Sequence, residues 1–138
     1  MTTISRIDHI AIAVHSIKDA SQFYTKGLGL TIAKIEEMPE RGIRTAFIKI
    51  GESMIELIEP LDNKTQSSEI SKFLAQRGAG LHHVAFKTEN IGQSSQELKD
   101  QGARLIYEEP QKGAHDTRIN FVHPKSSNGV LIELVNYQ

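Results

Sequence analysis

The chain has 138 residues, of which 38% are hydrophobic and 24% are charged, and its formal net charge at pH 7 is −1. This length allows one domain or two small modules packed as one, and the charge gives no electrostatic reason to expect nucleic acid or a membrane surface as a partner. The absence of cysteine excludes disulfides and thiolate chemistry. The absence of a signal-peptide pattern or a membrane-spanning apolar run favours a cytoplasmic protein.

The first predicted strand covers residues 10–14 and directly follows His9. Because side chains alternate across a strand, His9 shares a face with Ala11 and Ala13, two small residues that leave room for a ligand. The opposite face carries isoleucine and valine and needs a covering element. Ser16 resembles the N-cap of a helix that supplies this cover. The residues expected to do so, at helical spacing, are Ile17, Ala20, Tyr24 and Leu28.

Three more strands follow in the first half, and the sequence Gly51-Glu52 predicts a hairpin turn between the last two. The expected strands are at about 30–36, 43–50 and 53–59. The polar stretch Asp62–Ser68 then leads into a short helix over 68–77, with Gly78 just past its end. We interpret this stretch and helix as a linker.

The second half repeats this order. Asn90 is the expected N-cap of a helix that runs to about Gln101, and Gly102 stops it. The strands around this helix are expected at 83–87, near 104–108, at 117–123 and at 130–136. Each half therefore reads β-α-β-β-β.

The two halves also match residue by residue. At one constant offset His9 pairs with His83, and after a short slip in a turn the sequence IEL recurs, which pairs Glu56 with Glu133. A repeat of this length indicates a duplicated supersecondary unit. We predict an α+β fold in a single domain. Its parts are module 1 (about 5–61), a linker helix (about 62–79) and module 2 (about 80–138).

The repeated histidines and glutamates predict a metal site shared by the two modules. Glu56 and Glu133 are each flanked on their own strand face by apolar residues, where an unpaired carboxylate is costly and two carboxylates repel. A divalent cation bound by His9, Glu56, His83 and Glu133 removes both problems. Imidazole and carboxylate together suit Zn, Co, Ni, Mn or Fe better than Ca or Mg. A histidine at the start of a strand is more often structural, and His82, on the opposite strand face, is the chief alternative to His83.

The chain resembles a known family over nearly its full length. Its members are the methylmalonyl-CoA epimerases of the vicinal oxygen chelate (glyoxalase) superfamily. The longest matching stretch, residues 105–135, contains the motifs RINF, HPKS and GVLIEL. The other matching stretches are IDHIAIAV (7–14), PERGIRTAFIKIG (39–51), IELIEP (55–60) and KFLAQRGAGLHHVAF (72–86).

The resemblance implies two modules that form a cupped mixed sheet around one divalent metal ion per chain, of Co, Mn, Zn or Ni. It carries the metal ligands onto His9, Glu56, His83 and Glu133. It also implies an acyl-CoA substrate and a homodimer that acts in propionate metabolism. The expected reaction interconverts (R)- and (S)-methylmalonyl-CoA through an enolate-like intermediate, with Glu133 as a catalytic base. Many family members have Gln where this chain has Glu56, so this ligand is the most replaceable.

The second base is not assigned. Thr45 stands where some family members have a glutamate, and threonine is a poor base near neutral pH. Glu40, His115 or a metal-bound water are the candidates. His115, Arg118 and Lys125 are candidate substrate-binding residues, although an exposed charge without a dedicated partner is an equally good reading of Arg118 and Lys125.

Two other functions stay open. A lactoylglutathione lyase-type metalloenzyme uses the same ligand types, and only the long C-terminal stretch argues against it. A non-catalytic small-molecule-binding protein of the same fold does not need a metal, so metal content separates it from both enzymes. An iron dioxygenase is less favoured, because its usual site has three protein ligands and this chain offers four.

Overall fold

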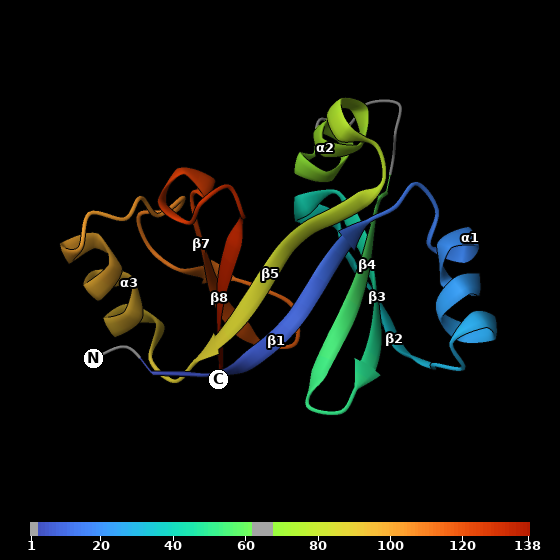
Figure 1. Cartoon of the computed structure of the whole chain (residues 1–138), viewed down its shortest axis with the longest axis horizontal. Coiled ribbons are helices and arrows are strands. Elements are labelled where there is room, and N and C mark those ends of the chain that lie inside the picture. Colours follow the sequence, from blue (N-terminus) through green and yellow to red (C-terminus); the bar gives the residue numbers. More distant parts are fainter. Residues whose placement is uncertain (1–2, 62–67) are drawn as a thin grey trace. The chain divides into compact units, whose positions relative to one another are not determined.

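The computed structural model describes residues 3–61 and 68–138, and its elements follow the predicted order (Figure 1). In chain order they are β1 (Ile4–Ala13), α1 (Ile17–Gln22), a π-helical turn (Phe23–Gly27), β2 (Ile32–Met38), a 3-10 turn (Pro39–Arg41), β3 (Ile43–Ile50), β4 (Ser53–Pro60), α2 (Glu69–Arg77), β5 (Gly80–Thr88), α3 (Ile91–Asp100), β6 (Gln111–Lys112), β7 (Thr117–Val122), a 3-10 turn (Pro124–Ser126) and β8 (Ile132–Tyr137). The β-α-β-β-β succession occurs on both sides of α2. The α+β class is confirmed.

The chain divides into two compact units, one formed by Ile10–His82 and the other by Met1–His9 with His83–Gln138. Strands β1 and β5 each contribute residues to both. These units do not follow the limits of the sequence repeat, and the single domain of two modules stays a prediction. Most of the predicted linker stretch, residues 62–67, lies outside the described residues.

In the unit Ile10–His82, the strands follow the order β2-β3-β4-β1, and the pairs β2–β3 and β3–β4 are antiparallel. Gly51 has a φ of 58° and turns the chain between β3 and β4, as predicted. Helix α1 begins as predicted, because the Ser16 hydroxyl accepts a hydrogen bond from the Asp19 N–H at 3.2 Å. Ile17 packs with Val14 and with core residues of β3 and β4. The β-branched face of β1 is therefore covered by α1.

The prediction that Leu28 joins this cover is wrong, since its side chain is 56% exposed. The chain leaves α1 through the π-helical turn Phe23–Gly27. A π turn holds more residues than an α turn, so an apolar stripe at α-helical spacing does not continue through it. Tyr24 still packs against the core, but Leu28 does not.

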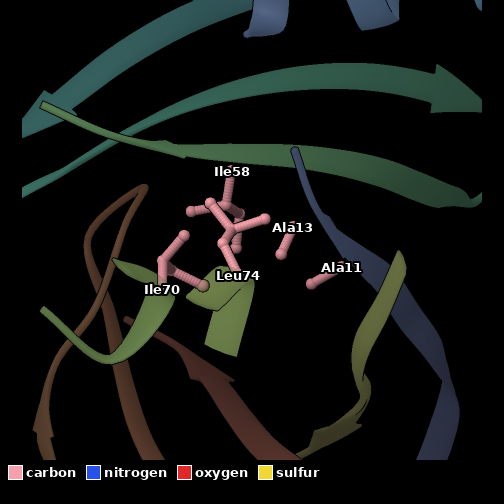
Figure 2. Packing of buried hydrophobic residues seen from close by; sticks show 5 residues of the cluster. All are labelled: Ala11, Ala13, Ile58, Ile70 and Leu74. Carbon is pink, nitrogen blue, oxygen red and sulfur yellow. The ribbon is translucent and has the colours of Figure 1, made fainter. Parts of the chain in front are cut away.

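The expected room beside Ala11 and Ala13 is also absent. Both residues are fully buried, and they form a cluster with Ile58 of β4 and with Ile70 and Leu74 of α2 (Figure 2). Helix α2 begins with Ser68 as its N-cap and places its apolar stripe on this face. The small residues of β1 therefore accommodate a helix at these two positions, not a ligand.

In the other unit, the strands follow the order β1-β5-β8-β7-β6, with β5 parallel to β8 and with the pairs β8–β7 and β7–β6 antiparallel. Asn90 caps α3 as predicted, because its side chain accepts a hydrogen bond from the Gln93 N–H at 3.0 Å. Ala85, Ile119 and Val135 form a cluster of buried hydrophobic residues in this unit. No helix in the described part of the chain is long and apolar enough to cross a membrane.

The strand predicted near 104–108 is wrong, because this segment makes only an isolated bridge between Leu105 and Val122 and the strand β6 forms later. The fully buried side chain of Asn120 explains the difference. Its amide accepts a hydrogen bond from the Tyr107 N–H and donates one to the Tyr107 carbonyl, both at 3.1 Å. A side chain thus takes the backbone groups that a continuous ladder would use.

Candidate metal centre

Three buried side chains converge within the unit formed by Met1–His9 and His83–Gln138. They are His9 of β1, His83 of β5 and Glu133 of β8. The parallel register places Glu133 beside Ala85, the next residue after His83 on the same face of β5. Each residue enters the cluster from a different strand, so the backbone hydrogen bonds of the sheet hold all three in place.

The distances between their polar atoms are short. Glu133 Oε1 lies 2.9 Å from His9 Nε2 and 2.9 Å from His83 Nε2. The two Nε2 atoms lie 3.2 Å apart, and the two imidazole rings meet edge to face at 75°. Two imidazole nitrogens and a carboxylate oxygen thus form one compact donor set.

This donor set fits a divalent transition metal. Ligand atoms bound at about 2.0–2.2 Å and at right angles to one another are separated by about 3 Å, which is the spacing observed here. Two imidazoles and a carboxylate are ligand types that zinc, cobalt, nickel, manganese and iron accept in proteins. We conclude that His9, His83 and Glu133 are suited to share one cation.

The histidines also decide the charge of Glu133. Burial alone would raise the pKa of its carboxyl group, but the charge of His83 and hydrogen bonds from His83 and His9 outweigh burial and hold the pKa well below its ordinary value. The carboxylate is therefore ionised at neutral pH. Protons on the imidazoles and a metal ion compete for the same lone pairs.

Sequence reasoning missed Asp8, which is 1% exposed and lies 2.8 Å from His9 Nδ1 through its Oδ2 atom. The Tyr137 hydroxyl donates a hydrogen bond to Asp8 Oδ1 at 2.8 Å. Burial would raise the pKa of Asp8, but the hydrogen bonds from His9, Tyr137 and Arg6 and the charge of His9 lower it overall. The signal in the sequence was a charged residue within the hydrophobic run IDHIAIAV, next to a predicted ligand.

Glu56 lies in the other unit, where it is buried on β4 opposite Phe47 of β3. Its strand face also carries Ile58, which packs in the cluster of Figure 2. Its part in metal binding stays a prediction.

The other histidines have different surroundings. The ring of His82 packs edge to face against Phe73 of α2, with ring centroids 4.9 Å apart. His123 precedes the 3-10 turn Pro124–Ser126, and its Nδ1 accepts a hydrogen bond from the Lys125 N–H at 3.0 Å. His15 is exposed in the bend before α1. Of the two neighbouring histidines in β5, His83 is the one in the donor set.

The predicted substrate-binding residues lie on or beside β7. The Arg118 guanidinium donates a hydrogen bond to the Pro110 carbonyl at 3.1 Å, and Lys125 is exposed. His115 and Asp116 precede β7 with φ angles of 55° and 56°, which is rare for residues with a side chain. This backbone is strained, as is common in loops that contact ligands. Their contact with a substrate stays a prediction.

Of the candidates for the second base, Glu40 lies in the unit Ile10–His82, together with Thr45, the residue that stands where some family members have a glutamate. Thr45 is buried on β3, where it pairs with Ile58 of β4. Glu40 is exposed in the 3-10 turn that precedes β3. Thr45 is therefore inside the fold and Glu40 is at its surface, and no second base is assigned.

Comparisons with known proteins agree with this description. A family model for the glyoxalase/bleomycin resistance protein/dioxygenase superfamily matches residues 8–121. The chain is 44% identical to the uncharacterized protein YqjC of Bacillus subtilis, over 95% of this chain and 91% of that protein. It is 37% identical to an ethylmalonyl-CoA/methylmalonyl-CoA epimerase of Cereibacter sphaeroides, over 95% of this chain and 97% of that protein.

A solved structure of an epimerase is also similar to this chain. A variant of Streptomyces coelicolor methylmalonyl-CoA epimerase, in complex with 2-nitronate-propionyl-CoA, superposes on this chain with a TM-score of 0.91 at 38% sequence identity. The match covers 98% of this chain and 99% of that chain. The resemblance that residues 105–135 and the shorter stretches indicate is therefore confirmed.

Proposed function

The chain belongs to the glyoxalase/bleomycin resistance protein/dioxygenase superfamily, and from this premise we propose that it interconverts (R)- and (S)-methylmalonyl-CoA. Two observations support the proposal together. Named epimerases match nearly the full length of the chain at 37–38% identity, and His9, His83 and Glu133 bring three ligand atoms to within 3.2 Å of one another. The second observation carries the chemistry.

The reaction requires removal of a proton from the carbon between a thioester and a carboxylate, followed by its return to the opposite face. Negative charge then develops on the thioester oxygen. A divalent cation held by His9, His83, Glu133 and the predicted ligand Glu56 would supply Lewis-acid stabilisation of that charge. We expect cobalt, manganese, zinc or nickel in this role.

We assign removal of the proton on one face to Glu133. Its lowered pKa keeps the carboxylate ionised, so it is ready to accept a proton, but the same contacts make it a weaker base. Both histidines contact Oε1. We therefore assign the proton transfer to Oε2, which gains basicity as the contacts at Oε1 loosen.

A proton carrier on the other face is also required, because epimerisation needs delivery from the side opposite to removal. Thr45 has no acidic side chain to do this. Glu40, His115 and a bound water stay the candidates. Arg118, Lys125 and His115 are proposed to contact the acyl-CoA substrate, where cationic and imidazole groups suit its carboxylate and phosphates.

Homodimerisation, a cytoplasmic location and a role in propionate metabolism also belong to this proposal. The homodimer and the metabolic role follow from the resemblance of the sequence to the epimerases, and the cytoplasmic location is the expectation stated from the sequence pattern.

The deciding experiment supplies (R)-methylmalonyl-CoA to the purified protein in deuterated water and follows deuterium incorporation at the α carbon by NMR. The metal content of the same sample is measured by mass spectrometry. Incorporation together with formation of the (S) form is expected. Bound metal without any exchange would overturn the proposal, and activity on the hemithioacetal of glutathione and methylglyoxal would then identify a lactoylglutathione lyase. Absence of both metal and activity would favour a binding protein.

A further inference from the structure

Resting on the metal site of the proposed function, we infer that Asp8 is a positioning residue for the ligand His9. It fixes a hydrogen of the imidazole on Nδ1, so that Nε2, which faces His83 and Glu133, is the nitrogen that binds a cation once the cation displaces the hydrogen that Nε2 shares with Glu133. Asp8 acts through the ring of His9. It sets the orientation of the ring and determines which of its nitrogens binds a cation.

The contact between the two side chains supports this role. His9 Nδ1 lies 2.8 Å from Asp8 Oδ2, and both residues are buried. An ionised carboxylate accepts hydrogen bonds and has no hydrogen to donate, so Nδ1 is the donor. A neutral ring that carries its hydrogen on Nδ1 has its lone pair on Nε2. Nε2 is the atom that lies 2.9 Å from Glu133 Oε1 and 3.2 Å from His83 Nε2.

Asp8 is itself held in orientation by its other oxygen. The Tyr137 hydroxyl donates to Oδ1 at 2.8 Å, and the Arg6 guanidinium donates to the same atom at 3.3 Å. The Tyr137 ring is in turn flanked by Arg6 and Lys87, whose charged groups lie 6.0 Å and 5.7 Å from its centroid. Rotation of the carboxylate away from His9 would break these contacts. Tyr137, near the end of β8, thus orients Asp8, and Asp8 orients the imidazole ring of His9.

An asparagine at this position would not reproduce the arrangement, although it has the same shape. Three donors, from His9, Tyr137 and Arg6, converge on the carboxylate. An amide offers only one accepting atom and one donating group. If its NH₂ group faces His9, Nδ1 must accept and the hydrogen moves to Nε2, where it blocks the metal. If the NH₂ group faces Arg6, two donors oppose each other.

The test measures the affinity of metal-free protein for Co²⁺ by calorimetry. Asp8→Asn is expected to weaken Co²⁺ binding by about 10–100-fold, the usual effect of removing a partner that orients a ligand. Tyr137→Phe is expected to cause a smaller loss, because the contact between Oδ2 and His9 remains. Equal affinity in wild type and Asp8→Asn would overturn the inference and leave the metal site intact. Failure of the wild type to bind Co²⁺ would overturn both.

Thr88→Val provides the matched control. Thr88 is fully buried in the same unit as the last residue of β5, and its hydroxyl lies 2.6 Å from that of Ser94. This variant is expected to lower Tm without changing Co²⁺ affinity. A loss of affinity as large as that of Asp8→Asn would show a general effect of destabilisation and overturn the inference.

A second measurement needs no variant, so it holds even if Asp8→Asn does not fold. Long-range ¹H–¹⁵N NMR spectra of the zinc-loaded wild type report which nitrogen of each histidine carries the hydrogen. For His9 the hydrogen is expected on Nδ1. A hydrogen on Nε2, with zinc at Nδ1, would overturn the inference.

Discussion

Glu133 Oε1 lies 2.9 Å from His83 Nε2 because the parallel pairing of β5 with β8 sets Glu133 beside Ala85. This register brings a carboxylate and an imidazole from strands far apart in the chain onto one face of the sheet. A slip of one residue in the pairing would turn Glu133 to the opposite face, since side chains alternate along a strand. The candidate metal centre therefore depends directly on how these two strands pair.

Glu133→Gln tests the base. The amide keeps the size and an oxygen donor but is not basic, so we expect kcat for epimerisation to fall by about 10²–10⁴-fold. The rate of α-proton exchange and the metal content are measured on the same preparation. Glu109→Gln, at an exposed position, is the control. A rate near that of wild type, with metal bound, would show that another residue is the base.

Glu56→Gln and Glu56→Ala test the predicted fourth ligand. Gln retains a carbonyl oxygen as a donor, so we expect Co²⁺ affinity to fall by roughly tenfold or less, whereas Ala removes the donor and should cost about 100-fold or more. Calorimetric titration of the metal-free variants measures both. Equal affinities for the two variants would mean that Glu56 is not a ligand.

Asn120→Ala tests how much the hydrogen bonds between Asn120 and the backbone of Tyr107 stabilise the fold. It removes the partners of the Tyr107 N–H and carbonyl. At about 1–3 kcal/mol for each polar group left unpaired, and with Tyr107 only half-buried, we expect the free energy of unfolding to fall by about 2–4 kcal/mol. Urea denaturation provides the measurement. The exposed control Gln96→Ala should change stability by about 0.5 kcal/mol or less.

The acid stability of the metal-free protein follows from the lowered pKa values of Asp8 and Glu133. Their ordinary values are 3.8 and 4.5, so the unfolded chain takes up protons at a higher pH than the folded one. Their stabilisation is complete above these values and is lost as the pH falls below them. We expect the urea midpoint to drop between about pH 5 and pH 3. In Glu133→Gln the drop should be shallower, and an unchanged slope would contradict the ion pairing.

Local signals in the sequence predicted the helix starts and, to within one residue, the limits of β3, β4 and β7, whereas β1 and β5 begin earlier than the predicted strands. Ser16 and Asn90 cap their helices as expected, because an N-cap depends on a side chain and a backbone N–H only three residues apart. The repeat likewise predicted His9, His83 and Glu133 as members of one site, and the structure brings these three side chains together. Duplication preserves the position of a residue on its strand, so equivalent residues occupy equivalent places on the sheet.

Other features depended on contacts between residues distant in sequence. The Tyr137 hydroxyl donates a hydrogen bond to Asp8 from near the other end of the chain, and the Asn120 side chain of β7 holds the segment 104–108 through the backbone of Tyr107. Leu28 is exposed because a π-helical turn interrupts the α-helical spacing, and the spacing of apolar residues alone does not predict such a turn. Helix α2 covers the face of β1 beside Ala11 and Ala13. The sequence pattern had predicted room for a ligand on this face.

The amino-acid sequence by itself determined the succession of elements, the caps and the matched histidines and glutamates, because these arise from periodicity and short-range hydrogen bonding. Only the tertiary structure decided which polar atoms meet and which faces are covered. Hydrogen bonds are directional and need atoms within about 3 Å, and a spacing along the chain does not set a distance across the sheet.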